Sequence, residues 1–84
     1  MDSSEMRRAA LAKRLRVAPD DLRPGPQEGI GSRFELQPGG YYCVYSPDEE
    51  KQAFKTRVPD VPFVDQIRDG DGKTYNVYLA VENR

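Results

Sequence analysis

Histidine and tryptophan are absent from this 84-residue chain, and cysteine occurs once, as Cys43. Without histidine, the Ser-His or Cys-His pair of a hydrolytic active site cannot form. A single cysteine cannot form an intramolecular disulfide, and without histidine an ordinary zinc site lacks its ligands. These absences argue against an enzyme, a disulfide-stabilised secreted domain and a metal site. They predict a protein with no cofactor in a reducing, cytoplasmic setting.

Long hydrophobic runs are also missing. No apolar stretch approaches the ~20 residues that span a bilayer, and the start lacks the charged-then-apolar pattern of a secretory signal. Thirteen basic side chains nearly balance fourteen acidic ones, which gives no overall attraction to nucleic acid. We therefore expect no membrane partner and, at this length, one domain with one core.

The N-terminal part of the chain is predicted to form a helix. Residues 3–16 predict a helix, because Asp2 or Ser3 can cap it and alanine and leucine propagate it. Its apolar residues do not form one stripe, since Met6 lies nearly opposite Leu11 on the helix. We therefore expect this helix to lie between two surfaces.

The rest of the chain predicts two hairpins with a helix between them. Two prolines and three glycines make residues 23–31 a predicted linker. The first predicted hairpin consists of strands 32–36 and 41–45, joined by a type II turn at Pro38-Gly39. A helix is predicted from the Ser46 cap to about Arg57. The second predicted hairpin consists of strands 61–68 and 74–81, joined by the turn 69–72. The prediction is an α+β fold of order α-β-β-α-β-β, with a helical segment 1–22, the linker 23–31 and a ββαββ core 32–84.

Few residues suggest chemistry. Cys43 lies among aromatic residues in a predicted strand, which is typical of a small buried hydrophobic residue. Glu35, Asp65 and Asp69 are candidates for paired carboxylates, although fourteen acids in a short chain produce such pairings by chance. The segment 69–72 resembles the start of a calcium loop but lacks its third acid and closing glutamate, so we interpret it as a plain turn.

Nucleic-acid binding is one alternative that the residues leave open. The basic candidates cluster in the N-terminal helix and are Arg7, Arg8, Lys13, Arg14 and Arg16. Tyrosines on an open sheet face are suited to stacking on bases. This hypothesis predicts an affinity that falls steeply with salt.

Protein binding is the leading hypothesis, because the chain is small, has no catalytic groups and carries tyrosine and arginine, which often anchor interfaces. The predicted contact residues are Tyr41, Tyr42, Tyr45, Arg57 and Tyr78. A small chain also gains buried area from a second copy, so the hypothesis includes a homodimer. A structural subunit of a larger assembly is a further alternative.

A family resemblance adds a candidate partner. Over residues 10–56, the leucine-containing helix, the Phe34-Glu-Leu36 strand, the run Tyr41–Tyr45 and the acidic helix start Ser46–Glu50 resemble small accessory proteins of bacteriophages and mobile elements. Those families include anti-CRISPR proteins. The resemblance implies an inhibitor that occludes a surface of a nuclease or defence complex, and it assigns no functional residue.

Overall fold

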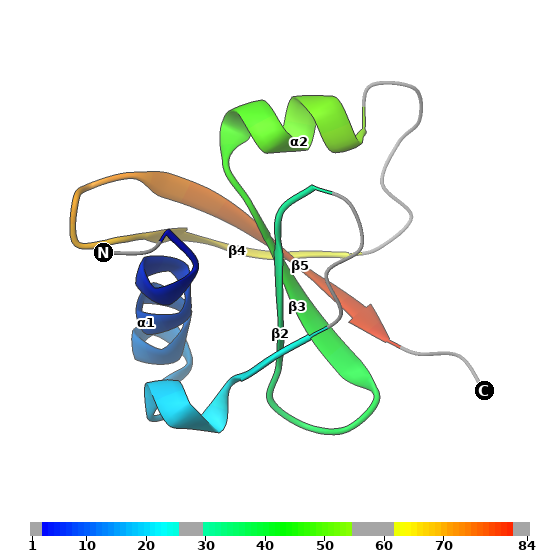
Figure 1. Cartoon of the computed structure of the whole chain (residues 1–84). Coiled ribbons are helices and arrows are strands. Elements are labelled where there is room, and N and C mark those ends of the chain that lie inside the picture. Colours follow the sequence, from blue (N-terminus) through cyan, green and yellow to red (C-terminus); the bar gives the residue numbers. More distant parts are fainter. Residues whose placement is uncertain (1–2, 26–29, 55–61, 82–84) are drawn as a thin grey trace.

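The computed structural model describes residues 3–25, 30–54 and 62–81, in which a five-stranded antiparallel sheet carries an α-helix on each face (Figure 1). The elements are α1 (Ser3–Leu15), the 3-10 turn η1 (Pro19–Asp21), β1 (Arg23–Pro24), β2 (Ser32–Glu35), β3 (Gly40–Tyr45), α2 (Pro47–Ala53), β4 (Phe63–Arg68) and β5 (Thr74–Val81). This confirms the predicted α+β class, with five strands in place of about four.

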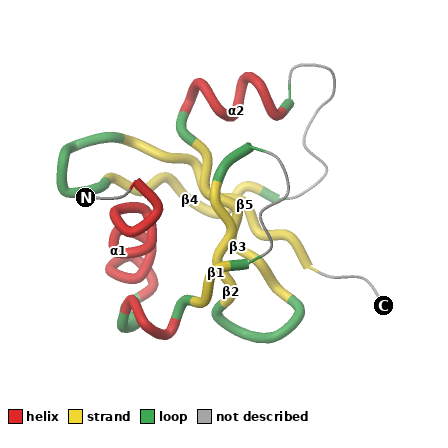
Figure 2. Tube along the Cα trace, in the orientation of Figure 1, coloured by secondary structure: helices red, strands yellow, loops and turns green. Residues whose placement is uncertain are grey.

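The strands lie in the order β1-β2-β3-β5-β4, so β3 and β5 form the centre of the sheet (Figure 2). Tyr42 pairs with both Phe34 of β2 and Leu79 of β5, and this register is continuous along β3. A bulge between Phe63 and Asp65 interrupts β4, the longer of the two edge strands. The two predicted hairpins therefore meet side by side through their second strands.

The main core lies between α1 and the sheet. Leu11 of α1 and Leu22 pack there against Phe34, Val44 and Val77, and each of these side chains is at most 1% exposed. Successive residues of a strand point to opposite faces, so Cys43, Tyr45 and Tyr78 lie on the other side. They pack there with Ala53 and Phe54 at the end of α2. The two helices thus cover opposite faces of one sheet.

Helix α1 buries one face, and the expectation that it lies between two surfaces is wrong. Leu11 and Ala12 are buried against the sheet, and Arg7, one turn before Leu11, is only 8% exposed. The buried stripe therefore includes an arginine. A hydrophobicity pattern cannot detect a stripe in which a charged residue occupies a core position.

The first residues of the predicted linker form a strand. Arg23 pairs with Glu35 and Pro24 with Phe34, which places β1 at the sheet edge. Proline is tolerated at such an edge because it need not donate a hydrogen bond to the sheet. This short strand is the fifth strand, which the sequence pattern did not predict, and residues 26–29 of the linker lie outside the described part.

Both predicted turns are confirmed. In the first, the Gly40 N–H donates to the Gln37 carbonyl and Gly39 has a φ of +88°, as a type II turn after Pro38 requires. In the second, the Gly72 N–H donates to the Asp69 carbonyl and Gly72 has a φ of +83°. Glycine supplies the positive φ without steric cost in both turns.

Helix α1 ends in a Schellman motif built on an arginine. Arg16 has a φ of +60°, its N–H donates to Lys13, and the Val17 N–H donates to the Ala12 carbonyl. A side chain in this left-handed conformation is strained by about 1 kcal/mol. We expect Arg16→Gly to raise the free energy of unfolding by about 1 kcal/mol in urea titrations. Arg16→Ala keeps the strain and should give no such gain, so an equal gain in both variants would contradict this explanation.

Candidate functional site

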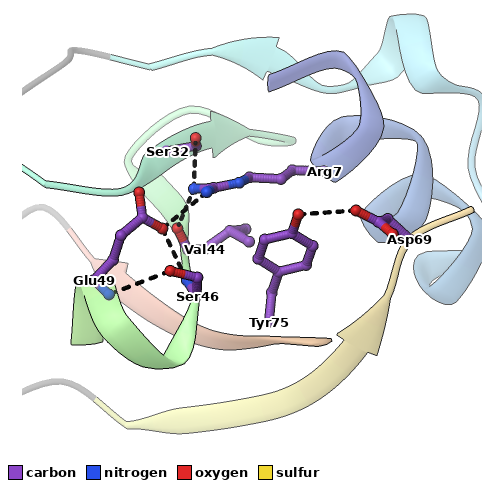
Figure 3. A network of polar contacts seen from close by, with 7 residues as sticks. All are labelled: Arg7, Ser32, Val44, Ser46, Glu49, Asp69 and Tyr75. Carbon is purple, nitrogen blue, oxygen red and sulfur yellow. Dashed lines mark hydrogen bonds and ion pairs between the residues drawn. The ribbon is translucent and has the colours of Figure 1, made fainter. Parts of the chain in front are cut away.

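The densest polar cluster surrounds Arg7 and joins both helices to the sheet (Figure 3). The Arg7 guanidinium donates to Ser32 Oγ at 3.2 Å and to the Val44 carbonyl at 3.4 Å, and it forms an ion pair of 2.9 Å with Glu49 of α2. It also lies 4.7 Å from the centre of the Tyr75 ring. These groups come from α1, β2, β3, α2 and β5, so the cluster holds the layers together.

Two carboxylates complete this cluster. Burial alone would raise the pKa of Glu49, but hydrogen bonds from the Ser46 backbone and Arg7 outweigh it and lower that pKa. Asp69 accepts hydrogen bonds from the Tyr75 hydroxyl at 2.8 Å and from the Asp71 and Lys73 N–H groups. Every carboxylate here is used by the fold, which marks the cluster as structural.

The other basic candidates of α1 divide into two groups. Arg8 donates to the Pro19 carbonyl and pairs with Asp20, and Arg14 pairs with Asp65 of β4. Lys13, Arg14 and Arg16 are exposed, and Lys13 and Arg16 form none of the ion pairs found among the described residues. Because Arg7, Arg8 and Arg14 bind protein acceptors, the N-terminal helix does not present five basic groups to one phosphate surface.

The three candidate carboxylates are not brought together. Glu35 lies on β2 and Asp65 on β4, and β3 and β5 separate these strands. Asp69 follows β4 and stands four residues from Asp65, about 13 Å along an extended strand. The pKa of Asp65 is lowered by hydrogen bonds from the Gln66 N–H and Arg14. No pair of these acids has the geometry of a general acid and base.

Cys43 is buried, 2% exposed, in the middle of β3. Burial raises the pKa of its thiol, so the reactive thiolate is disfavoured. Cys43 therefore has the environment of a small buried hydrophobic residue, as predicted.

The structure separates the predicted contact residues into different environments. Tyr45 and Tyr78 are 8% and 7% exposed and pack edge to face with each other and with Phe54, so they are not the exposed anchors that the sequence suggested. Tyr41 is half-buried on the same face of β3. Arg57 lies outside the described residues. Among the described members of this set, Tyr42 alone points to the α1 side of the sheet.

Tyr42 lies in an open groove on that face, beyond the end of the surface that α1 covers. The turn groove is lined by residues 37–40 together with Leu36, Tyr42, Leu79 and Val81, and it has a volume of about 650 Å³. Val81 is 67% exposed, the highest exposure among the large apolar side chains described. None of the described residues that line the groove is charged.

Element lengths explain why this end of the sheet is open. Helix α1 has thirteen residues and β5 has eight, so they span about 20 Å and 26 Å respectively. Val77, Leu79 and Val81 alternate along β5 and therefore share one apolar face of the sheet. Comparing the two lengths would have indicated that the helix leaves part of this apolar face uncovered. The prediction of tyrosines as contact residues did not use this signal.

Comparison with known proteins adds no assignment: no family model, curated protein or solved structure matches this chain. Within the described ranges, neither α-helix has the length and apolar character needed to cross a membrane. The same ranges contain no group of three or more Cys, Asp or Glu side chains arranged to hold a metal ion.

Proposed function

We propose that this protein is a non-enzymatic protein-binding module and that the turn groove receives an apolar, uncharged segment of its partner. The observation that carries the proposal is the groove itself. Apolar side chains and turn backbone form most of its described lining, which also includes Gln37 and Tyr42, and the groove is open to solvent at Val81. A partner side chain that enters it loses contact with water without meeting an unpaired charge.

Val81→Asp is the variant that tests the groove. Val81 pairs with Gly40 at the end of β5 and is largely exposed, so the substitution places a charge in the groove while the core stays intact. We expect affinity for the partner to fall at least about tenfold, because a contact at the centre of an apolar interface is desolvated on binding. A tagged pull-down from bacterial lysate, with and without nuclease, supplies the partner, and calorimetry measures its affinity.

Val64→Asp is the matched control. Val64 is 42% exposed, on β4, and does not line the groove. It makes the same chemical change elsewhere and should leave the affinity within about twofold. Equal affinity of Val81→Asp and the wild-type protein would overturn the groove as the binding site. Recovery that disappears with nuclease would favour nucleic-acid binding instead.

The resemblance over residues 10–56 leads us to propose a bacterial defence complex as the partner, inhibited by occlusion of a surface. The test is target-DNA cleavage by such a complex with and without the protein. Inhibition by the wild-type chain and by Val64→Asp, but not by Val81→Asp, supports this partner. Undiminished cleavage at saturating protein contradicts it for the complex tested.

A further inference from the structure

Glu50 of α2 is held over β5 by two neutral donors. Its Oε1 accepts a hydrogen bond of 3.0 Å from the Tyr78 hydroxyl, and its Oε2 accepts one from the Asn76 side-chain amide. Asn76 and Tyr78 alternate with the core residues of β5, so this carboxylate lies on the α2 face, opposite the turn groove. Two hydrogen bonds from different residues fix its orientation.

Glu50 forms no ion pair within the described part of the chain. Glu49 pairs with Arg7 and Asp65 with Arg14, but none of the ion pairs found there includes Glu50. Tyr78 and Asn76 orient the carboxylate without neutralising it. Each oxygen keeps acceptor capacity for a further donor, because a carboxylate offers about four lone-pair sites.

The carboxylate lines a shallow pocket with an aromatic wall. Pro47, Lys51 and Phe54 also line it, and the volume is about 360 Å³. Tyr45 and Tyr78 pack edge to face against Phe54, with centroid distances of 5.4 and 5.6 Å, which fixes its ring. A fixed carboxylate beside a fixed phenyl ring attracts a cation through both ionic and cation–π interactions.

We propose that this pocket binds an arginine or lysine side chain of a partner protein. The proposal rests on the protein-binding function above and gives the module a second, polar contact on the face opposite the turn groove. Tyr78, a predicted contact residue, acts here as a positioning residue that orients Glu50. Lys51 lies at the same pocket and opposes a second cation, so it limits the affinity.

Titration of the ¹⁵N-labelled protein with N-acetyl-L-arginine amide, followed by NMR, tests the pocket without the partner. The Asn76 side-chain amide is the reporter, since it donates to Glu50. We expect saturable shifts there and in α2. N-acetyl-L-citrulline amide has nearly the same shape but no charge, and it should bind about tenfold more weakly. A lysine derivative should resemble the arginine derivative.

Three variants show whether Glu50 causes the binding. Glu50→Gln keeps the side-chain length and should lower arginine affinity about tenfold. Lys51→Gln should raise it about twofold, because a like charge is removed. Asp48→Asn is the matched control: Asp48 is exposed on the same helix but does not line the pocket, so the affinity should stay within about twofold.

The proposal is overturned if the arginine probe gives no saturable shift, if citrulline binds equally well, or if Asp48→Asn weakens binding as much as Glu50→Gln. The last result would indicate attraction to the general acidity of α2. Failure here is distinct from failure of the turn groove. Val81→Asp tests the groove with the partner, whereas the arginine titration tests this pocket with the chain alone.

Discussion

Replacing Arg7 with alanine is expected to lower the free energy of unfolding by about 3 kcal/mol. The guanidinium is nearly buried and contacts Ser32, the Val44 carbonyl, Glu49 and the Tyr75 ring. Alanine removes these contacts and leaves the Glu49 carboxylate without its cation. In a domain of this size, the change corresponds to a melting temperature roughly 15 °C lower, measurable by circular dichroism.

A double-mutant cycle separates the ion pair from the packing of the arginine stem. The Arg7 Nε is buried without a hydrogen-bond partner in the described structure, so part of the gain from the ion pair is offset. We expect the combined Arg7→Ala and Glu49→Ala variant to be more stable than additivity predicts by about 1 kcal/mol. Strict additivity would show that the pair contributes nothing beyond its separate contacts.

The pH dependence of folding stability tests the Arg7–Glu49 ion pair independently. The pKa of Glu49 is lowered in the folded state, so its ionised carboxylate contributes to folding stability. This contribution is fully present above the unfolded-state pKa and is lost as pH falls through the folded-state pKa. Arg7→Ala removes one cause of that lowering. The variant should therefore lose less stability between neutral and acidic pH than the wild-type protein does, and an unchanged pH dependence would contradict this.

The fold was predictable where local signals agree with the tertiary structure. Ser46 caps α2 as predicted, through a reciprocal hydrogen-bond pair with Glu49. Pro38-Gly39 gives the expected turn. Arg7 was not predictable as a core residue, because its burial depends on a carboxylate 42 positions later in the chain and on a tyrosine beyond it. The five-residue basic surface was therefore expected from the sequence but is not formed.

The candidate site was less predictable than the fold. Side-chain type suggested tyrosines as contacts, but exposure depends on which part of each sheet face a helix covers. Tyr45 and Tyr78 lie under α2, whereas Tyr42 lies beyond α1. The pairing of Glu50 with β5 residues 26 and 28 positions away likewise requires the sheet register. Composition alone contains no information about either.

Gly31, which the sequence placed in a linker, leads to the second large effect. It has a φ of +93°, and an added Cβ would lie 2.6 Å from ring atoms of the buried Tyr45 and 3.0 Å from the Val44 carbonyl oxygen. Gly31→Ala therefore combines backbone strain with a clash, and we expect it to lower the free energy of unfolding by about 3 kcal/mol. Chemical denaturation with fluorescence detection measures this change.

Gly72→Ala separates the two causes. Gly72 has a similar φ of +83°, but no heavy atom lies within 4 Å of the added Cβ, so only backbone strain applies and about 1 kcal/mol should be lost. Equal losses at both glycines would show that Tyr45 moves aside without cost. If the clash operates, combining Gly31→Ala with Tyr45→Ala should cost less than the sum of the single changes. Gly31 would then be required for the packing of the α2-side core.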